Sequence, residues 1–180
     1  MDVLCVQIVD IQSVDNIRKG YIMQLQVKKI HPNAVVPTKI KGNLAFDLHC
    51  VHDKEFDAFL MVDDKKIFNL FPQQRKLFRT GLQIAIPEGY GCIIKDRSGL
   101  SVKGGLHVVA GVIDSSYRGE WMICLTNLNS NTGTNYWTTV TEGDRIAQAI
   151  IIPEYQLDFI EVDELSETWR GEKGFGSSGK

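Results

Sequence analysis

The chain has 180 residues, of which 43% are hydrophobic and 23% charged, and its formal net charge is −2. This length and composition fit one folded domain with a sizeable core and exclude a largely disordered chain. The weak negative charge excludes the broad basic surface that follows a nucleic-acid backbone, so we expect no nucleic-acid partner.

In chain order, the first predicted elements are short strands. Residues 1–22 precede a natural beginning at Met23 and are interpreted as an N-terminal extension. The stretch "QLQVKKI" (24–30) alternates apolar and polar residues, which is typical of a strand. The stretch "FLMVDDKKIFNLF" (59–71) places four charged residues between two apolar runs, which favours a hairpin over a short helix.

The same pattern continues in the second half of the chain. "GLQIAIPEGYGCIIKD" (81–96) predicts two strands joined by a Pro-Glu-Gly turn, and "SGLSVKG" (98–104) predicts one helical turn. "RIAQAIIIP" (145–153) predicts a strand that is buried on both faces, and "YQLDFIEV" (155–162) predicts one more strand. We therefore expect a mainly β sandwich, barrel or jelly-roll over residues 23–169.

The last eleven residues, 170–180, contain four glycines and a single core-type side chain, Phe175. Glycines let backbone N–H groups converge on an anion, and Arg170, Ser177 and Ser178 add further donors. Ordering such a tail costs on the order of 1–2 kcal/mol per residue, so we expect a lid that closes over a highly charged ligand. A frayed C-terminus is the alternative.

The four cysteines are widely spaced and include no C-x-x-C pair. This spacing predicts reduced, mostly buried thiols in a cytosol-like compartment. The sequence shows neither a signal peptide nor an apolar run near the roughly 20 residues of a membrane span. We therefore expect a cytoplasmic protein, in the host cytoplasm if the source is viral, and no membrane partner.

Polar residues interrupt several apolar stretches. Arg97 and Ser98 precede Gly99 at a strand end, which suits two donors aimed at phosphate oxygens. Gln148 lies in an apolar run and Asp47 in the stretch "LAFDLH", and each needs polar partners within the protein or on a ligand.

The stretch "AGVIDSSYRGEW" (110–121) places Asp114 and Tyr117 three residues apart, with a glycine on either side. Together with the stretches above, it resembles the motifs of one known family. Taken in order, the five stretches resemble the five motifs of the trimeric dUTPase family, and they are Ala45–Leu48, Arg97–Leu100, Gly111–Gly119, Gly143–Gln148 and Arg170–Gly179. The resemblance covers about residues 23–180.

The resemblance implies a distorted β jelly-roll subunit and a homotrimer whose active sites are shared between subunits. It also implies Mg²⁺-dependent hydrolysis of dUTP to dUMP and pyrophosphate, which keeps uracil out of DNA and supplies dUMP for dTMP synthesis. Asp114 would orient and deprotonate the water that attacks the α-phosphorus, and Tyr117 would lie under the deoxyribose, leaving no room for a 2′-hydroxyl. Asp47 would hold a water of the Mg²⁺ shell while the triphosphate supplies the direct ligands.

The resemblance divides the remaining site residues by the part of dUTP that they would contact. The residues implied for the phosphate oxygens are Arg97, Ser98, Gly99 and Gln148. Those implied for the closing tail are Arg170, Phe175, Gly176, Ser177 and Ser178, with Phe175 over the uracil. Those implied for reading uracil by backbone groups lie in a hairpin around His107, Val108, Val109, Ala110 and Gly111.

The chain departs from the family pattern in places. Asp96 replaces the usual proline before Arg97 and adds negative charge near the phosphates, and Leu44-Ala45 replaces Ala-Gly. "HVVAGVID" (107–114) resembles a stretch of dCTP deaminases, which share this fold, but Cys124 stands where those enzymes have a catalytic glutamate. The dUTPase interpretation is favoured, and the alternatives are a dCTP deaminase, a bifunctional enzyme and a nucleotide-binding regulator.

Overall fold

The computed structural model describes residues 22–53, 59–130 and 137–172. The predicted N-terminal extension therefore lies almost entirely outside the described residues, as does most of the predicted lid. Within the described ranges the fold is mainly β, as the sequence predicts, with one short helix, α2 (Ser98–Gly104).

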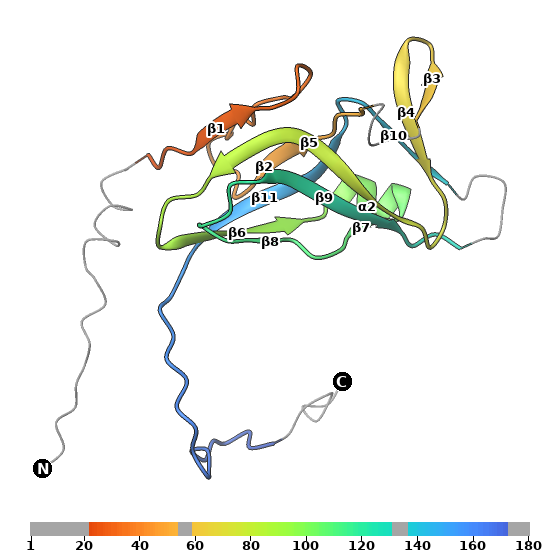
Figure 1. The fold of residues 1–180 in the computed structure, drawn as a ribbon. Coiled ribbons are helices and arrows are strands. Elements are labelled where there is room, and N and C mark those ends of the chain that lie inside the picture. Colours follow the sequence, from red (N-terminus) through yellow and green to blue (C-terminus); the bar gives the residue numbers. More distant parts are fainter. Residues whose placement is uncertain (1–21, 54–58, 131–136, 173–180) are drawn as a thin grey trace, which may run out of the picture.

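Figure 1 shows the arrangement of the strands. Their bounds, in chain order, are β1 (Gln26–Lys29), β2 (Phe46–His49), β3 (Leu60–Val62), β4 (Lys65–Leu70), β5 (Arg75–Ala85), β6 (Tyr90–Lys95), β7 (Leu106–Val108), β8 (Val112–Ile113), β9 (Glu120–Asn127), β10 (Thr138–Thr141) and β11 (Arg145–Pro153). In the described ranges they form two four-stranded sheets, β1-β5-β9-β7 and β2-β11-β6-β8, and a three-stranded sheet, β10-β4-β3. All pairings in these sheets are antiparallel.

One hydrophobic core joins the two four-stranded sheets. Along β9, Trp121, Ile123 and Leu125 alternate with more exposed residues and are each at most 1% exposed. The other sheet contributes Leu48 of β2 and Ile146 of β11 to the same cluster. Because side chains alternate along each strand, the two sheets share one buried layer between them. The result is a distorted jelly-roll.

Most of the predicted elements are present. The stretch 59–71 forms the hairpin of β3 and β4, in which Asp63 and Asp64 have φ angles of 47° and 60°. Two consecutive left-handed residues match the twist of a two-residue hairpin turn, and aspartate tolerates this conformation. The stretch 81–96 forms the last part of β5 and all of β6, and its Pro-Glu-Gly turn leads from one four-stranded sheet to the other.

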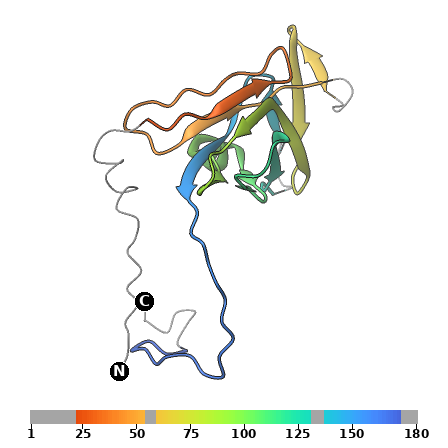
Figure 2. The same cartoon turned by 60° about the vertical axis from the view of Figure 1, so that its left-hand side comes forward.

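The prediction of a strand over residues 155–162 is wrong. After β11 the chain extends away from the sheets, and residues 154–162 form no strand (Figures 1 and 2). Leu157 and Phe159 are 73% and 89% exposed. The apolar alternation is there, but no described strand pairs with this segment, and a strand needs a partner for its backbone groups.

The strand β11 is buried on both faces only in its first half. Ile146, Ala147 and Ala149 are at most 1% exposed, whereas Ile152 is 37% exposed. The strand β2 pairs with β11 only as far as Ala149, so among the described strands β6 alone flanks the second half. The apolar run over residues 145–153 therefore predicted burial on both faces along the whole strand, whereas the single chain buries only its first half.

The hairpin expected around residues 107–110 is not a hairpin. The strand β7 pairs with β9, and β8 pairs with β6, so the segment between them connects the two four-stranded sheets. Ala110 and Gly111 have φ angles of 70° and 120°, and these conformations redirect the chain. A Cβ added at Gly111 would lie 2.9 Å from the carbonyl oxygen of Ile94, so this position requires glycine.

In the described part of the chain, no helix has the length and apolarity needed to span a membrane. Cys50, Cys92 and Cys124 are free thiols. Burial raises the pKa of Cys50 and of Cys92 to about 12, so these two thiols stay protonated at neutral pH.

Candidate active site

The turn after β8 brings Asp114 and Tyr117 together. The backbone N–H of Tyr117 donates to the carbonyl oxygen of Asp114 at 3.1 Å, which closes a four-residue turn. The guanidinium group of Arg118 donates to the carbonyl oxygens of Ser115 and Tyr117 at 2.5 and 2.9 Å. Asp114 and Tyr117 are both exposed, so this braced turn presents a carboxylate and a phenol ring to solvent.

The Tyr117 ring is held by the residues that follow it. Its hydroxyl group donates to the carbonyl oxygen of Glu120 at 3.0 Å. A Cβ added at Gly119 would overlap the hydroxyl group and the ring. The glycine therefore leaves the space in which the ring lies along the backbone.

A cavity of about 340 Å³ lies beside this turn. Strand β9 contributes Glu120 to Cys124 to its lining, and Leu77 and Ile94 add apolar surface. The predicted site residues that line it are Val108, Val109, Ala110, Gly111, Asp114 and Tyr117. The structure therefore brings the predicted catalytic turn and most of the predicted base-reading segment to one cavity, while His107 lies outside its lining.

Backbone groups in the base-reading segment are partly engaged. The N–H of Val108 donates to Oδ1 of Asp96 at 2.6 Å, and the N–H of Val109 donates to the carbonyl oxygen of Cys124 at 2.8 Å. The N–H groups of the next two residues donate to no described residue. Fewer backbone amides of this segment are therefore available to a ligand than the sequence implies.

A second group of predicted residues gathers on the sheet of β2, β11 and β6. Asp47 of β2 lies opposite Gln148 of β11, and both line a cavity of about 620 Å³. Arg97, just after β6, donates from Nε to Oδ1 of Asp47 at 2.8 Å, and Arg145 donates to Oδ2 at 3.2 Å. Two guanidinium groups around one carboxylate leave a net positive charge, which favours an anionic ligand.

Ser98 and Gly99 form the first turn of α2 beside Arg97, and both are exposed. A Cβ added at Gly99 would meet nothing within 4 Å, so packing does not explain this glycine and the space beside it is open. In the neighbouring strand, burial lowers the pKa of His49, although the charge of Asp47 acts in the opposite direction. The imidazole therefore adds no positive charge here at neutral pH.

Sequence reasoning missed the contacts of Asp96. We expected its charge to lie near the phosphates, and Asp96 lines the same cavity as Asp47 and Gln148. In addition, its carboxylate accepts the Val108 N–H at 2.6 Å and lies 2.7 Å from Nδ1 of His107. Its carbonyl oxygen accepts the side-chain amide of Gln148 at 2.6 Å. Asp96 therefore connects the two groups of site residues, through partners that are remote in sequence and gave no local signal.

The predicted lid lies mostly outside the described residues. Arg170 is described and is exposed on the segment that follows β11. The other tail residues, for which the roles stay predictions, are Phe175, Gly176, Ser177 and Ser178.

The chain is thus a distorted jelly-roll with a cavity beside an Asp-Tyr turn and an arginine pair suited to an anionic ligand. A family model described as dUTPase matches residues 49–179. The deoxyuridine 5'-triphosphate nucleotidohydrolase of Nautilia profundicola is 40% identical over 161 residues, which cover 88% of this chain and all of that protein. The chain belongs to the dUTPase family.

Solved structures agree with this assignment. A mutant dUTPase of Staphylococcus bacteriophage 80alpha, with dUpNHpp, superposes with a TM-score of 0.74 at 28% identity and covers 87% of this chain and 99% of its own. A mutant dUTPase from phage phi11 of S. aureus, described with a structural Mg(II) ion, has a TM-score of 0.63 at 25% identity and covers 79% and 98% of the two chains.

Proposed function

We propose that this chain hydrolyses dUTP to dUMP and pyrophosphate. The observation that carries the proposal is the single turn that holds Asp114 and Tyr117 at a cavity of nucleoside size. Membership of the dUTPase family supports it, as do relatives that are named deoxyuridine 5'-triphosphate nucleotidohydrolases.

Asp114 is proposed to orient and deprotonate the water that attacks the α-phosphorus. An exposed carboxylate on a rigid turn suits this role, because a general base must reach its water in a fixed geometry. Tyr117 is proposed to lie against the deoxyribose. The hydrogen bond to Glu120 fixes the ring, and a ring fixed there would leave no room for a 2′-hydroxyl group.

Uracil is proposed to be read by backbone groups rather than by side chains. The N–H groups of Val108 and Val109 are engaged within the protein, so among the described residues the amides of Ala110 and Gly111 are the donors for a base. The left-handed conformations of these two residues support the assignment, because they hold the backbone in one fixed shape. His107 would then support the segment through its contact with Asp96.

The triphosphate is proposed to bind beside Arg97, Ser98, Gly99 and Gln148. The guanidinium group supplies charge-assisted donors, and the open space at the glycine admits phosphate oxygens close to the backbone. The Gln148 amide already donates one hydrogen to the Asp96 carbonyl oxygen, which fixes its orientation and leaves the second hydrogen for a ligand.

Magnesium is proposed to bind through the triphosphate, with Asp47 holding one of its waters. The described residues contain no cluster of three or more acidic, histidine or cysteine side chains that could hold a metal. A single carboxylate fits water-mediated contact, because each oxygen that accepts from an arginine keeps a second lone pair. When bound, the ion would neutralise charge on the phosphates.

A homotrimer with shared active sites is proposed from the segment after β11. Large apolar side chains of this segment are 73% to 95% exposed in the single chain, and they are Leu157, Phe159, Ile160, Leu165 and Trp169. Exposed apolar side chains gathered on one extended segment favour burial against another subunit. If the segment packs against a neighbouring subunit, it would bring the tail to that subunit's site as a lid. The tail residues concerned are Arg170, Phe175, Gly176, Ser177 and Ser178.

The free thiols support a reducing compartment such as the cytoplasm. There the enzyme would keep dUTP out of DNA and supply dUMP.

Pyrophosphate release from dUTP, dCTP, dTTP and UTP tests the proposal, with ammonia release from dCTP measured in parallel. We expect turnover of dUTP, and we expect Asp114→Asn to lower it about 10²- to 10⁴-fold while dUTP still binds. Ammonia release from dCTP would instead identify a deaminase. Equal inactivity of the parent chain and Asp114→Asn, with dUTP binding retained, would identify a nucleotide-binding regulator.

A further inference from the structure

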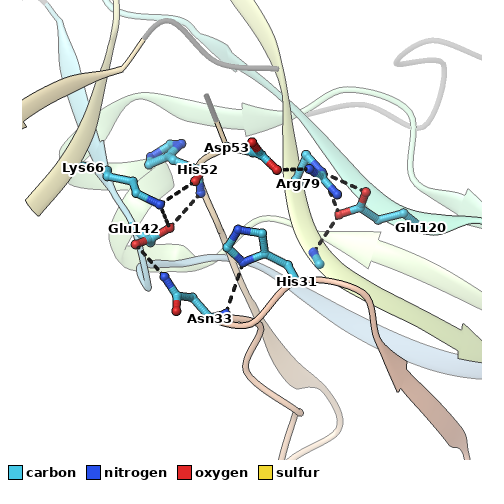
Figure 3. A network of polar contacts seen from close by, with 9 residues as sticks. His31, Asn33, His52, Asp53, Lys66, Arg79, Glu120 and Glu142 are labelled. Atoms are coloured by element: carbon cyan, nitrogen blue, oxygen red, sulfur yellow. Dashed lines mark hydrogen bonds and ion pairs between the residues drawn. The ribbon is translucent and has the colours of Figure 1, made fainter. Parts of the chain in front are cut away.

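A buried charge cluster lies behind the Tyr117 turn. Figure 3 shows Arg79 between two carboxylates, those of Asp53 and Glu120. Nε of Arg79 donates to both carboxylate oxygens of Glu120, at 2.9 and 3.2 Å, and NH1 donates to Asp53 at 2.9 Å. The side chains of Arg79 and Glu120 are only 10% and 12% exposed. Charges this buried persist in a fold only when they are paired.

Strand β5 is shaped to complete this cluster. The register between β5 and β9 shifts within the pair, so that residues 80–82 bulge. In the bulge, Gly81 has a φ angle of 69°, and its N–H donates to the Glu120 carboxylate at 2.7 Å. A Cβ added at Gly81 would lie 2.6 Å from the Cβ of His31, so only glycine fits there. The Glu120 side chain is therefore held by both a guanidinium group and a backbone amide.

The cluster reaches the ring of Tyr117 through the backbone of Glu120. Glu120 begins β9, and its carbonyl oxygen accepts the Tyr117 hydroxyl group at 3.0 Å. Gly119, which directly precedes Glu120, lets the ring lie close to the chain. One residue thus has its side chain clamped by Arg79 and its carbonyl oxygen bonded to Tyr117.

We propose that Arg79 and Glu120 are positioning residues for Tyr117 and thereby set the discrimination of this enzyme against ribonucleotides. The inference rests on the proposed function, in which the Tyr117 ring excludes a 2′-hydroxyl group. Arg79 does not line the cavity beside Tyr117, and Glu120, which does, is proposed to act through its carbonyl oxygen. They fix the carbonyl oxygen that holds the ring, and a displacement of about 1 Å at a reacting site is enough to change rates strongly.

The effect on selectivity is separable from an effect on folding. Beyond its first residue, β9 pairs with residues 75–79 of β5 and with β7, and these pairings do not involve the Glu120 carboxylate. Loosening the clamp therefore moves the start of β9 and the ring first. The measured quantity that follows the ring is the ratio of kcat/KM for dUTP to kcat/KM for UTP.

The test compares variants of the full chain by pyrophosphate release from dUTP and UTP, with melting temperatures measured alongside. Arg79→Met removes the clamp, Arg79→Lys keeps the charge but loses the fork of donors, and Tyr117→Phe removes only the bond to Glu120. We expect the dUTP/UTP ratio to fall about tenfold or more in Arg79→Met and by less in the other two. Lys76→Met, which removes another cation from β5, is the matched control and should keep the ratio.

The outcomes separate this inference from the proposed function. If Tyr117→Ala keeps the parent ratio, the sugar-excluding role of Tyr117 is wrong, and the inference fails with it. If Tyr117→Ala lowers the ratio while Arg79→Lys and Tyr117→Phe leave it unchanged, only the positioning role is overturned. If the Arg79 variants lose activity equally toward dUTP and UTP, the positioning role is also overturned, because that result indicates a purely structural role. Should Arg79→Met fail to fold, Arg79→Lys and Tyr117→Phe decide.

Discussion

The two sides of the candidate site are built differently. On the nucleoside side, the segment Val108–Gly119 is continuous in sequence, and left-handed backbone at Ala110 and Gly111 sets its shape. On the phosphate side, Asp47 and Arg97 come from separate segments and are held by side-chain pairs. One side therefore depends on backbone conformation and the other on charge, so substitutions should affect them unequally.

The largest expected effect is on the nucleoside backbone. Gly111→Ala places a Cβ 2.9 Å from the Ile94 carbonyl oxygen in a conformation that side chains rarely adopt. We expect the free energy of unfolding to fall by about 2–3 kcal/mol, as measured by urea unfolding. Gly99→Ala on the phosphate side, where an added Cβ meets nothing, is the matched control and should change stability by less than about 1 kcal/mol. If Gly111→Ala and Gly99→Ala lose equal free energy of unfolding, the nucleoside side does not depend more on backbone conformation than the phosphate side.

An intermediate effect is expected at Asp96, which joins the two sides. Asp96→Ala leaves the part-buried N–H of Val108 without its acceptor, so we expect a loss of about 1–2 kcal/mol in thermal or urea unfolding. Asp96→Asn keeps an acceptor oxygen and should lose less. His107→Gln changes only the other partner, whose side chain is 46% exposed, and should be nearly neutral. A larger loss in His107→Gln than in Asp96→Ala would mean that the contact with His107, not the one with the backbone amide, matters.

The smallest expected effect concerns the turn that leads into the phosphate-side strand β11. Glu142 accepts from Nζ of Lys66 at 3.0 Å and from the His52 N–H at 3.1 Å (Figure 3). Burial acts to raise the pKa of Glu142, but these hydrogen bonds outweigh it and lower the pKa. A lowered folded-state pKa means that the stabilisation is complete above the unfolded value of 4.5 and is lost as the pH falls through the folded-state pKa.

Glu142→Gln should therefore be less stable than the parent chain at neutral pH, by about 1 kcal/mol or less. The difference should shrink well below pH 4.5, where the parent carboxylate also becomes neutral. Urea unfolding across this range measures both differences, and Glu88→Gln in an exposed turn is the control. A difference that stays constant with pH would show that shape, not charge, holds this turn.

Much of the fold was predictable where the signal is local. The hairpin at 59–71 and the strands around the Pro-Glu-Gly turn follow from alternation and turn chemistry in neighbouring residues. The sequence analysis did not predict β9, although "EWMICLTN" alternates and contributes Trp121, Ile123 and Leu125 to the core. The strand expected at 155–162 was wrong, because alternation predicts a strand only where a partner strand exists.

The candidate site divides in the same way. The Asp114 and Tyr117 turn could be predicted from one stretch, because turn, carboxylate and ring are all within it. The roles of Asp96, Arg79 and Glu120 could not, since most of their partners lie between 11 and 52 residues away.

From the residues alone one can predict that the chain is mainly β, that the site motifs occur in order, and that Asp114 and Tyr117 share a turn. The contact of Asp96 with the base-reading segment and the clamp of Arg79 on the start of β9 depend on how the strands pair in the fold. Turns and alternation depend on residues that are adjacent in sequence. The partners of a buried charge are distant in sequence and come close only when the strands pair.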